Sequence, residues 1–281
     1  MGPQNKLGTF GGVFTPSILT ILGVILFLRL GYVVGNGGLA ETLLIILLAN
    51  TISFLTAYSL VAIASNLHIK GGGPYYIISR TLGPEWGGVI GIILFFAVSV
   101  SVAFYCIGAA EVLAPILYLD EAGVSYTAAF IATVLFIIAW LGADVSTKFQ
   151  YIVMVVLFSA LFSFFAGALG QAEVQTLKDS WQQPEDSEHF WILFAIFFPA
   201  ITGFTQGVNM SGDLEHPSRS IIAGTAWAVG ISFLVYLCSA VLLAAAFDLQ
   251  SLKTDMNLME HGAWFPELVV AGILAAAISS A

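Results

Sequence analysis

Long apolar runs separated by short polar segments occupy the chain from end to end. Six runs contain no Asp, Glu, Lys or Arg and exceed the roughly 20 residues that a helix needs to cross a bilayer. These runs are 42–69, 86–110, 122–143, 151–172, 189–212 and 221–247. A seventh, 15–36, is apolar except for Arg29, and an eighth begins near Trp264 and is still apolar at Ala281. The pattern predicts seven complete helical spans and an eighth that is cut short.

Composition identifies the solvent around these spans. Hydrophobic residues make up 59% of the chain, charged residues only 9%, and the mean hydropathy is +0.96. A water-soluble domain with this composition would expose large apolar patches, so the surrounding solvent must be lipid. We therefore expect an all-α polytopic membrane protein, and we place it in the plasma membrane. The first run is too long for a cleavable signal peptide and should remain as a span.

Positive charges in the short loops predict the orientation. When the spans are threaded alternately, one side of the membrane carries Lys6, Lys70, Arg80, Lys148 and Arg219. The other side carries only Lys178 and Lys253. Because Lys and Arg accumulate in cytoplasmic loops, this asymmetry predicts a cytoplasmic N-terminus. The acidic segment 171–189 then becomes an extracellular loop.

Two spans contain helix-breaking residues in their interior. The first, TPSILTILGVILFLRLGYVVG, has Pro16 near its start and Gly23 at mid-membrane, and the sixth, FFPAITGFTQGVNMSGD, has Pro199 followed by Gly203 and Gly207. Proline removes a backbone donor and glycine weakens a helix. Lipid cannot satisfy the backbone groups that are freed, so such breaks persist only where they are buried in protein or line a cavity. Both spans are therefore predicted to be interrupted helices at a binding site.

The spacing of the two breaks predicts an inverted repeat. Gly23 and Gly203 each lie in the first span of a five-span set, and an odd number of spans inverts the second set in the membrane. The expected organisation is a first repeat at 1–170, an extracellular loop at 171–189 and the start of an inverted second repeat at 190–281. The second repeat lacks two spans, which suggests a fragment of a longer protein.

Several segments resemble one transporter family. The most specific are GGGPYYIISRTLGPEWGG and FFPAITGFTQGVNMSGDLEHPSRSIIAGT, supported by ILGVILFLRL, AFYCIGAAEVL and AAAISSA. They resemble the cation-chloride cotransporter family, a branch of the amino acid-polyamine-organocation superfamily, and are most similar to its sodium-potassium-chloride type. The resemblance implies secondary cotransport of Na⁺, K⁺ and Cl⁻ by alternating access on a fold with broken helices one and six.

The resemblance also implies three groups of ion ligands and no resident cofactor. Potassium would be bound by Thr20, Ile21, Tyr105, Pro199 and Thr202. Sodium would be bound by Leu19, Leu22, Ala276, Ser279 and Ser280. Chloride would lie against backbone N–H groups of Gly23, Val24, Ile25, Gly203, Phe204 and Thr205. Thr20 and Leu22 differ from the asparagine and tryptophan that are common in the family, although both would contribute mainly carbonyls.

The estimated depths of the candidate ion ligands in the membrane place them in one central layer. Gly23, Tyr105, Thr202 and the Ser279–Ser280 pair each lie about 12 to 16 residues from the predicted outer end of their spans, or roughly 20 Å at 1.5 Å per residue. The charged residues Arg29 and Glu111 lie nearer the outer face. An isolated charge inside a membrane costs about 3 kcal/mol, so we expect these two to pair, as a gate above the site or as a static ion pair.

Two other functions remain open. An amino-acid transporter could use the same fold, although ILGVIL offers less room for an α-carboxylate than a glycine-rich break. A non-transporting membrane partner subunit would also fit an incomplete second repeat. The chain carries no catalytic motif and no basic patch for nucleic acid, so we predict no enzymatic activity. The expected partners are lipid and small inorganic ions, and a homodimer would use parts outside this chain.

Overall fold

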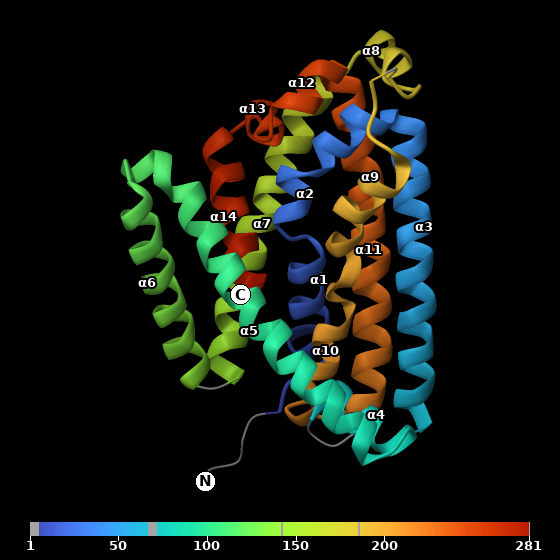
Figure 1. Cartoon of the computed structure of the whole chain (residues 1–281), viewed down its shortest axis with the longest axis vertical. Helices are drawn as coiled ribbons and strands as arrows, with labels where there is room; N and C mark the ends of the chain where they lie inside the picture. Colours follow the sequence, from blue (N-terminus) through green and yellow to red (C-terminus); the bar gives the residue numbers. More distant parts are fainter. Residues whose placement is uncertain (1–5, 67–71, 142, 185, 281) are drawn as a thin grey trace.

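A computed structural model describes residues 6–66, 72–141, 143–184 and 186–280, and Lys70 of the orientation argument lies outside them. The described chain is helical apart from its connections (Figure 1). The membrane-length elements are α3 (Leu30–Asn66), α5 (Pro84–Leu117), α6 (Glu121–Trp140), α7 (Ala143–Gln171) and α11 (Pro217–Ala246). In this part of the chain, seven stretches are long and apolar enough to cross a membrane, and α14 (Pro266–Ser280) is shorter. The expected set of spans is confirmed.

Spans one and six are assembled from short pieces. Span one consists of the π-helical turn η1 (Phe10–Phe14), α1 (Thr15–Ile21), α2 (Val24–Leu28) and the part of α3 that precedes Gly38. Span six consists of α9 (Phe190–Phe197), the 3₁₀-helix η2 (Phe198–Thr205), α10 (Gln206–Asn209) and the 3₁₀ turn η3 (Met210–Gly212). Short helices α4 (Gly73–Thr81), α8 (Val174–Asp179), α12 (Leu249–Thr254) and α13 (Leu258–His261) lie in the connections. The interruptions expected in both spans are therefore present.

The chain turns sharply at Gly38, which ends span one and begins span two inside α3. Gly38 has φ 66° and ψ 170°, a region that is open essentially to glycine alone. The next two N–H groups donate to the carbonyls of Ser180 and Trp181, so the turn is fastened to the segment after α8. A Cβ atom at Gly38 would lie 2.5 Å from the carbonyl oxygen of Gln182. Backbone therefore packs directly on backbone at this turn.

Local signals explain where several helices start. Asp120 precedes α6 and accepts a hydrogen bond from the N–H of Gly123, and Asp248 does the same before α12 with Ser251. Hydrogen bonds from the Ser251 side chain and backbone lower the pKa of the Asp248 carboxyl, because they stabilise its charged form. Proline stands in the first turn of α5 and of α11, where its missing N–H costs nothing.

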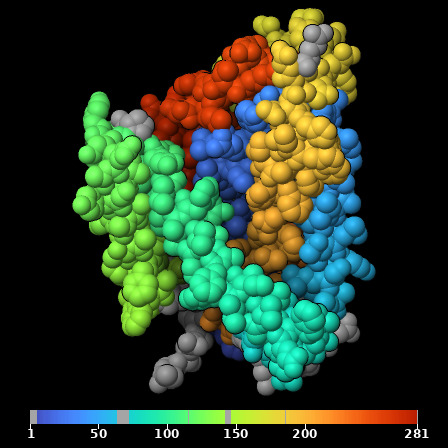
Figure 2. All heavy atoms as spheres, viewed as in Figure 1, coloured from blue at the N-terminus to red at the C-terminus, as the bar shows by residue number. Residues whose placement is uncertain are grey.

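Span one lies at the centre of the packed helices. It contacts α7, α11, α14 and the η2 segment of span six, and α3 packs along α11. Near the N-terminus, Leu7 donates to the carbonyl of Asp213 and accepts from Glu215, which ties the start of span one to the end of span six. By contrast, α5 and α6 lean away at one edge and expose apolar side chains such as Phe95 and Phe104, consistent with contact to lipid (Figure 1). Figure 2 shows the blue segment of span one recessed between α5 and the α9–η2 segment.

Candidate functional site

The helix of span one is broken at Leu22 and Gly23. Leu22 has ψ 48° and Gly23 has ψ −167°, so neither continues the helical path from α1 to α2. Leu19 and Leu22 have no exposed surface, which places the break inside the protein and not against lipid. Gly23 stands at the N-cap of α2, and no backbone acceptor is found for its N–H among the described residues. Polar backbone is thus available at the place that the sequence predicted.

Span six differs from the expectation in its local geometry. Gly203, Phe204 and Thr205, the chloride contacts implied by the resemblance, do not start an α-helix after the break. They close the 3₁₀ segment η2, and α10 starts only at Gln206. A 3₁₀-helix is wound more tightly than an α-helix but still pairs its backbone groups, by i→i+3 hydrogen bonds. Span six therefore departs from the α-helix here while most of its backbone groups stay paired. The N–H groups of these three residues therefore belong to a 3₁₀ segment and not to the first turn of an α-helix.

The two interrupted segments touch at Gly203. A Cβ atom placed there would lie 2.7 Å from Cβ of Thr20 and 2.9 Å from the backbone N of Ile21. Span eight approaches from another direction, since a Cβ atom on Gly23 would lie 3.5 Å from Oγ of Ser280. Three different spans therefore meet around the break in span one.

Several predicted ligands already form hydroxyl–carbonyl pairs. Thr202 donates to the carbonyl of Pro199 at 2.9 Å, and Ser279 and Ser280 both donate to Ala276, at 3.0 and 2.9 Å. A hydroxyl that donates its hydrogen keeps its oxygen lone pairs for another partner, whereas the Ala276 carbonyl already accepts from two hydroxyls. Each pair is therefore a cluster of neutral oxygens of the kind that can replace the water shell of a monovalent cation.

The other predicted ligands differ in their hydrogen bonds and burial. The Thr20 hydroxyl donates to Pro16 in its own helix at 2.8 Å. Val24 and Ile25, in the first turn of α2, are half-buried against the core, and Phe204 is buried in it. Tyr105, on α5, is half-buried.

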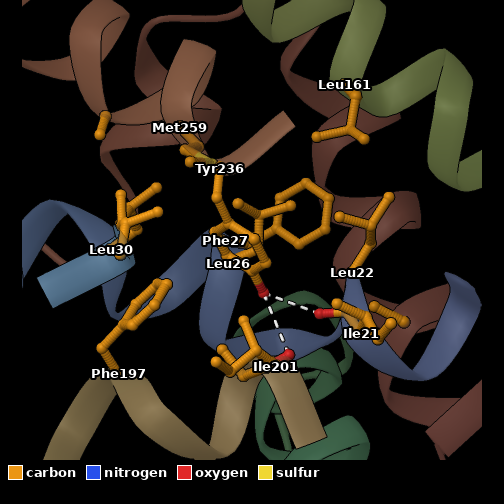
Figure 3. Packing of buried hydrophobic residues seen from close by; sticks show 14 of the residues in the cluster. Ile21, Leu22, Leu26, Phe27, Leu30, Leu161, Phe197, Ile201, Tyr236 and Met259 are labelled. Carbon is orange, nitrogen blue, oxygen red and sulfur yellow. Dashed lines mark hydrogen bonds between the residues drawn. The ribbon is translucent and has the colours of Figure 1, made fainter. Parts of the chain in front are cut away.

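Two buried hydroxyls in this region were not predicted. Tyr236 on α11 donates to the carbonyl of Ile21 at 2.7 Å and approaches that of Ala200 at 3.4 Å (Figure 3). Ser53 on α3 donates to Ile201 at 3.3 Å. They satisfy carbonyls that the interruptions would otherwise leave unpaired. A signal existed in the sequence: Tyr236 lies well inside its span, whereas membrane tyrosines are enriched at the interfaces.

Arg29 and Glu111 are not paired in this conformation. Arg29 lies in the kink between α2 and α3, and its Nη1 is 2.9 Å from Sδ of Met256 in the connection between α12 and α13. Glu111 is exposed on α5, and no ion pair joins the two residues within the described ranges. The expected contact is absent here because Arg29 turns toward the connection before α13, whereas Glu111 belongs to the helix that leans outward.

Comparisons with known proteins agree with this geometry. A family model described as "Amino acid permease" matches residues 12–281. Human solute carrier family 12 member 2 is 37% identical over 255 residues, which are 84% of this chain and 21% of that protein. Solute carrier family 12 member 1 of Mus musculus is 36% identical over 260 residues (85% and 24%), and member 9 of Xenopus laevis is 32% identical over 322 residues (99% and 36%).

These matches confirm the resemblance that the sequence motifs indicated. The chain spans between about a fifth and somewhat over a third of the length of these relatives. The matched families are transporters and not enzymes. An all-helical chain with an interrupted first span, matched from residue 12 to its last residue, belongs to the amino acid permease family of membrane proteins and is related to the cation-chloride cotransporters of solute carrier family 12.

Proposed function

We propose that the chain forms the core of a secondary transporter that moves Na⁺, K⁺ or both together with chloride by alternating access. The observation that supports this best is the contact of the η2 segment with the broken span one, where Gly203 lies against Thr20 and Ile21. Interrupted helices that face each other inside the protein provide polar backbone at a depth where lipid provides none.

In this proposal the ligand oxygens divide between two cations. Potassium takes the carbonyls of Thr20, Ile21 and Pro199 with the hydroxyls of Tyr105 and Thr202. Sodium takes the carbonyls of Leu19, Leu22 and Ala276 with the hydroxyls of Ser279 and Ser280. The hydrogen bonds of both serines to one carbonyl support the second group, because they hold three neutral oxygens of the same helix close together.

Chloride and the overall organisation complete the proposal. Among the described residues, no carbonyl across the break accepts from the N–H groups of Gly23, Val24 or Ile25, so these are better supported as anion contacts than Gly203 to Thr205. In this proposal, spans one to five form the first of two inverted repeats and the later spans belong to the second. The protein lies in the plasma membrane, with its N-terminus on the cytoplasmic side. The ions are substrates, and no resident cofactor is required.

Rubidium uptake tests the proposal. We expect proteoliposomes with the full-length protein, as its gene encodes it, to accumulate Rb⁺ only when Na⁺ and Cl⁻ are both present. Ser280→Ala should lower uptake about tenfold or more, because it removes a ligand oxygen next to Gly23. Ser99→Ala is the matched control, since Ser99 also donates to a carbonyl of its own helix but is exposed on α5.

Other outcomes of the same assay decide between functions. Chloride dependence without sodium dependence would assign potassium-chloride transport. Uptake of a neutral amino acid with no chloride dependence would replace the proposal with the amino-acid transporter. No uptake of any solute by correctly folded protein would favour a partner subunit.

A charge swap tests whether Arg29 and Glu111 pair as a gate in another conformation. We expect Arg29→Glu and Glu111→Arg each to lower uptake about tenfold, and the double variant to regain most of it, because two opposite charges then face each other again. Thermal stability in detergent should change little, since the pair is open in the described conformation. A double variant as inactive as the single variants would refute the gate.

A further inference from the structure

Tyr236 occupies the junction of the two interrupted spans. It lies on α11 with no exposed surface, and its hydroxyl donates to the carbonyl of Ile21, the last residue of α1, at 2.7 Å. The same hydroxyl is 3.4 Å from the carbonyl of Ala200 in η2. Figure 3 shows it between these segments, with dashed lines to Ile21 and to the backbone beside Ile201. One side chain from a third span thus contacts both breaks.

The ring of Tyr236 is held in place by its neighbours. Phe197, the last residue of α9, packs edge-to-face against it with ring centroids 5.2 Å apart and an interplanar angle of 84°. A buried phenol pays a desolvation cost unless its hydrogen is bonded, so the hydroxyl must keep an acceptor. The short distance to Ile21 makes that carbonyl the main acceptor and Ala200 a secondary one.

This bond acts on a carbonyl that has lost its helical partner. In an unbroken helix the Ile21 oxygen would accept from the N–H of Ile25, but Leu22 and Gly23 leave the helical path. A carbonyl oxygen has two lone pairs, so Tyr236 can occupy one and leave the other for a cation. Because the hydroxyl is immobilised, it also fixes the direction in which the remaining lone pair points.

We propose that Tyr236 is a positioning residue of the cation site, which orients the Ile21 carbonyl toward a bound monovalent cation and links that carbonyl to span six through Ala200. The inference rests on the proposed function, because it requires Ile21 to be a ligand. Tyr236 itself does not contact the ion. Its contribution is preorganisation, and its loss should therefore appear in cation affinity before it appears in the maximal rate.

The test is Tyr236→Phe in the full-length protein, which keeps the ring and removes only the hydroxyl. We expect the KM for Rb⁺ to rise about fivefold, the size of one net hydrogen bond. The KM for chloride and the maximal rate per folded molecule should stay within about twofold, because neither depends on the direction of one carbonyl. Tyr58→Phe is the matched control, since Tyr58 is 66% exposed on α3.

Three results would be decisive. An unchanged KM for Rb⁺ in stable Tyr236→Phe protein would overturn the positioning role while leaving the proposed function intact. A wild-type protein without ion-dependent uptake would overturn the proposed function and the positioning role together. If Tyr236→Phe did not fold, Phe197→Leu would keep the hydroxyl but loosen its ring, and a KM for Rb⁺ that did not rise in that variant would equally refute the inference.

Discussion

Replacing Gly203 with alanine is expected to reduce ion-dependent uptake about tenfold or more while the protein still reaches the membrane. The added Cβ would lie 2.7 Å from Cβ of Thr20 and 2.9 Å from the backbone nitrogen of Ile21. Neither group can move aside easily, because the Thr20 hydroxyl is bonded to Pro16 and the Ile21 carbonyl to Tyr236. Overpacking of this kind costs about 1–3 kcal/mol, and here it would separate the two interrupted spans.

The matched control is Gly230→Ala on α11. A Cβ atom there would meet nothing within 4 Å, so the same chemical change should leave uptake within about twofold of wild type. Uptake of Rb⁺ per molecule of surface-exposed protein is the measurement. Full activity of Gly203→Ala would show that spans one and six do not need their close contact, and it would remove the main support for the proposed site.

Gly38→Ala should have the largest effect on folding. Alanine at φ 66° and ψ 170° is strained by about 1–3 kcal/mol, and its Cβ would also lie 2.5 Å from the backbone oxygen of Gln182. Because the contact is with backbone that is already bonded to the turn, relief requires the whole segment 180–182 to shift. We expect a large loss of monodisperse protein and a marked drop in the thermal midpoint, measured by size-exclusion chromatography in detergent.

Alanine substitutions at two other glycines distinguish the effect of backbone strain from the effect of steric overlap. Gly83 also has a positive φ, 105°, but a Cβ there meets nothing within 4 Å, and Gly88 has open space without a positive φ. The expected order of destabilisation is Gly38→Ala, then Gly83→Ala, then Gly88→Ala. If Gly83→Ala were as damaging as Gly38→Ala, backbone strain alone would explain the effect and the packing of the turn on segment 180–182 would be unimportant.

The interruption in span one was predictable because its cause is local. Gly23 weakens the helix at mid-membrane, and the structure breaks the helix there, between α1 and α2. The form of the interruption in span six was not predictable. Pro199 and Gly203 signal a departure from α-helix, but the choice of a 3₁₀ segment depends on how closely η2 packs on Thr20 and on which hydroxyls reach its carbonyls.

Arg29 and Glu111 were expected to pair because they lie at similar depth in the membrane, but similar depth alone does not predict a contact. Equal distance from the outer face places two residues at one level but says nothing about the direction in which each side chain points. In the structure the kink after α2 places Arg29 against Met256, whereas Glu111 is exposed on α5, which runs diagonally from α4 toward α6 (Figure 1). Tyr236 was missed for a related reason: its acceptors lie on spans one and six, far away in the sequence.

The amino-acid sequence alone is enough to identify a polytopic helical membrane protein and to locate its spans. It also reveals the interruptions in spans one and six and the transporter family that the motifs resemble. These properties follow from composition and from short-range patterns. Lipid cannot bond to backbone groups, so each span must pair its backbone within its own helix, and a proline or glycine that breaks this pairing can be recognised in the sequence. Which side chains meet at the interruptions depends on how the folded spans pack together. Contacts such as Gly203 with Thr20 and Tyr236 with Ile21 arise from packing between distant spans, which no local pattern specifies.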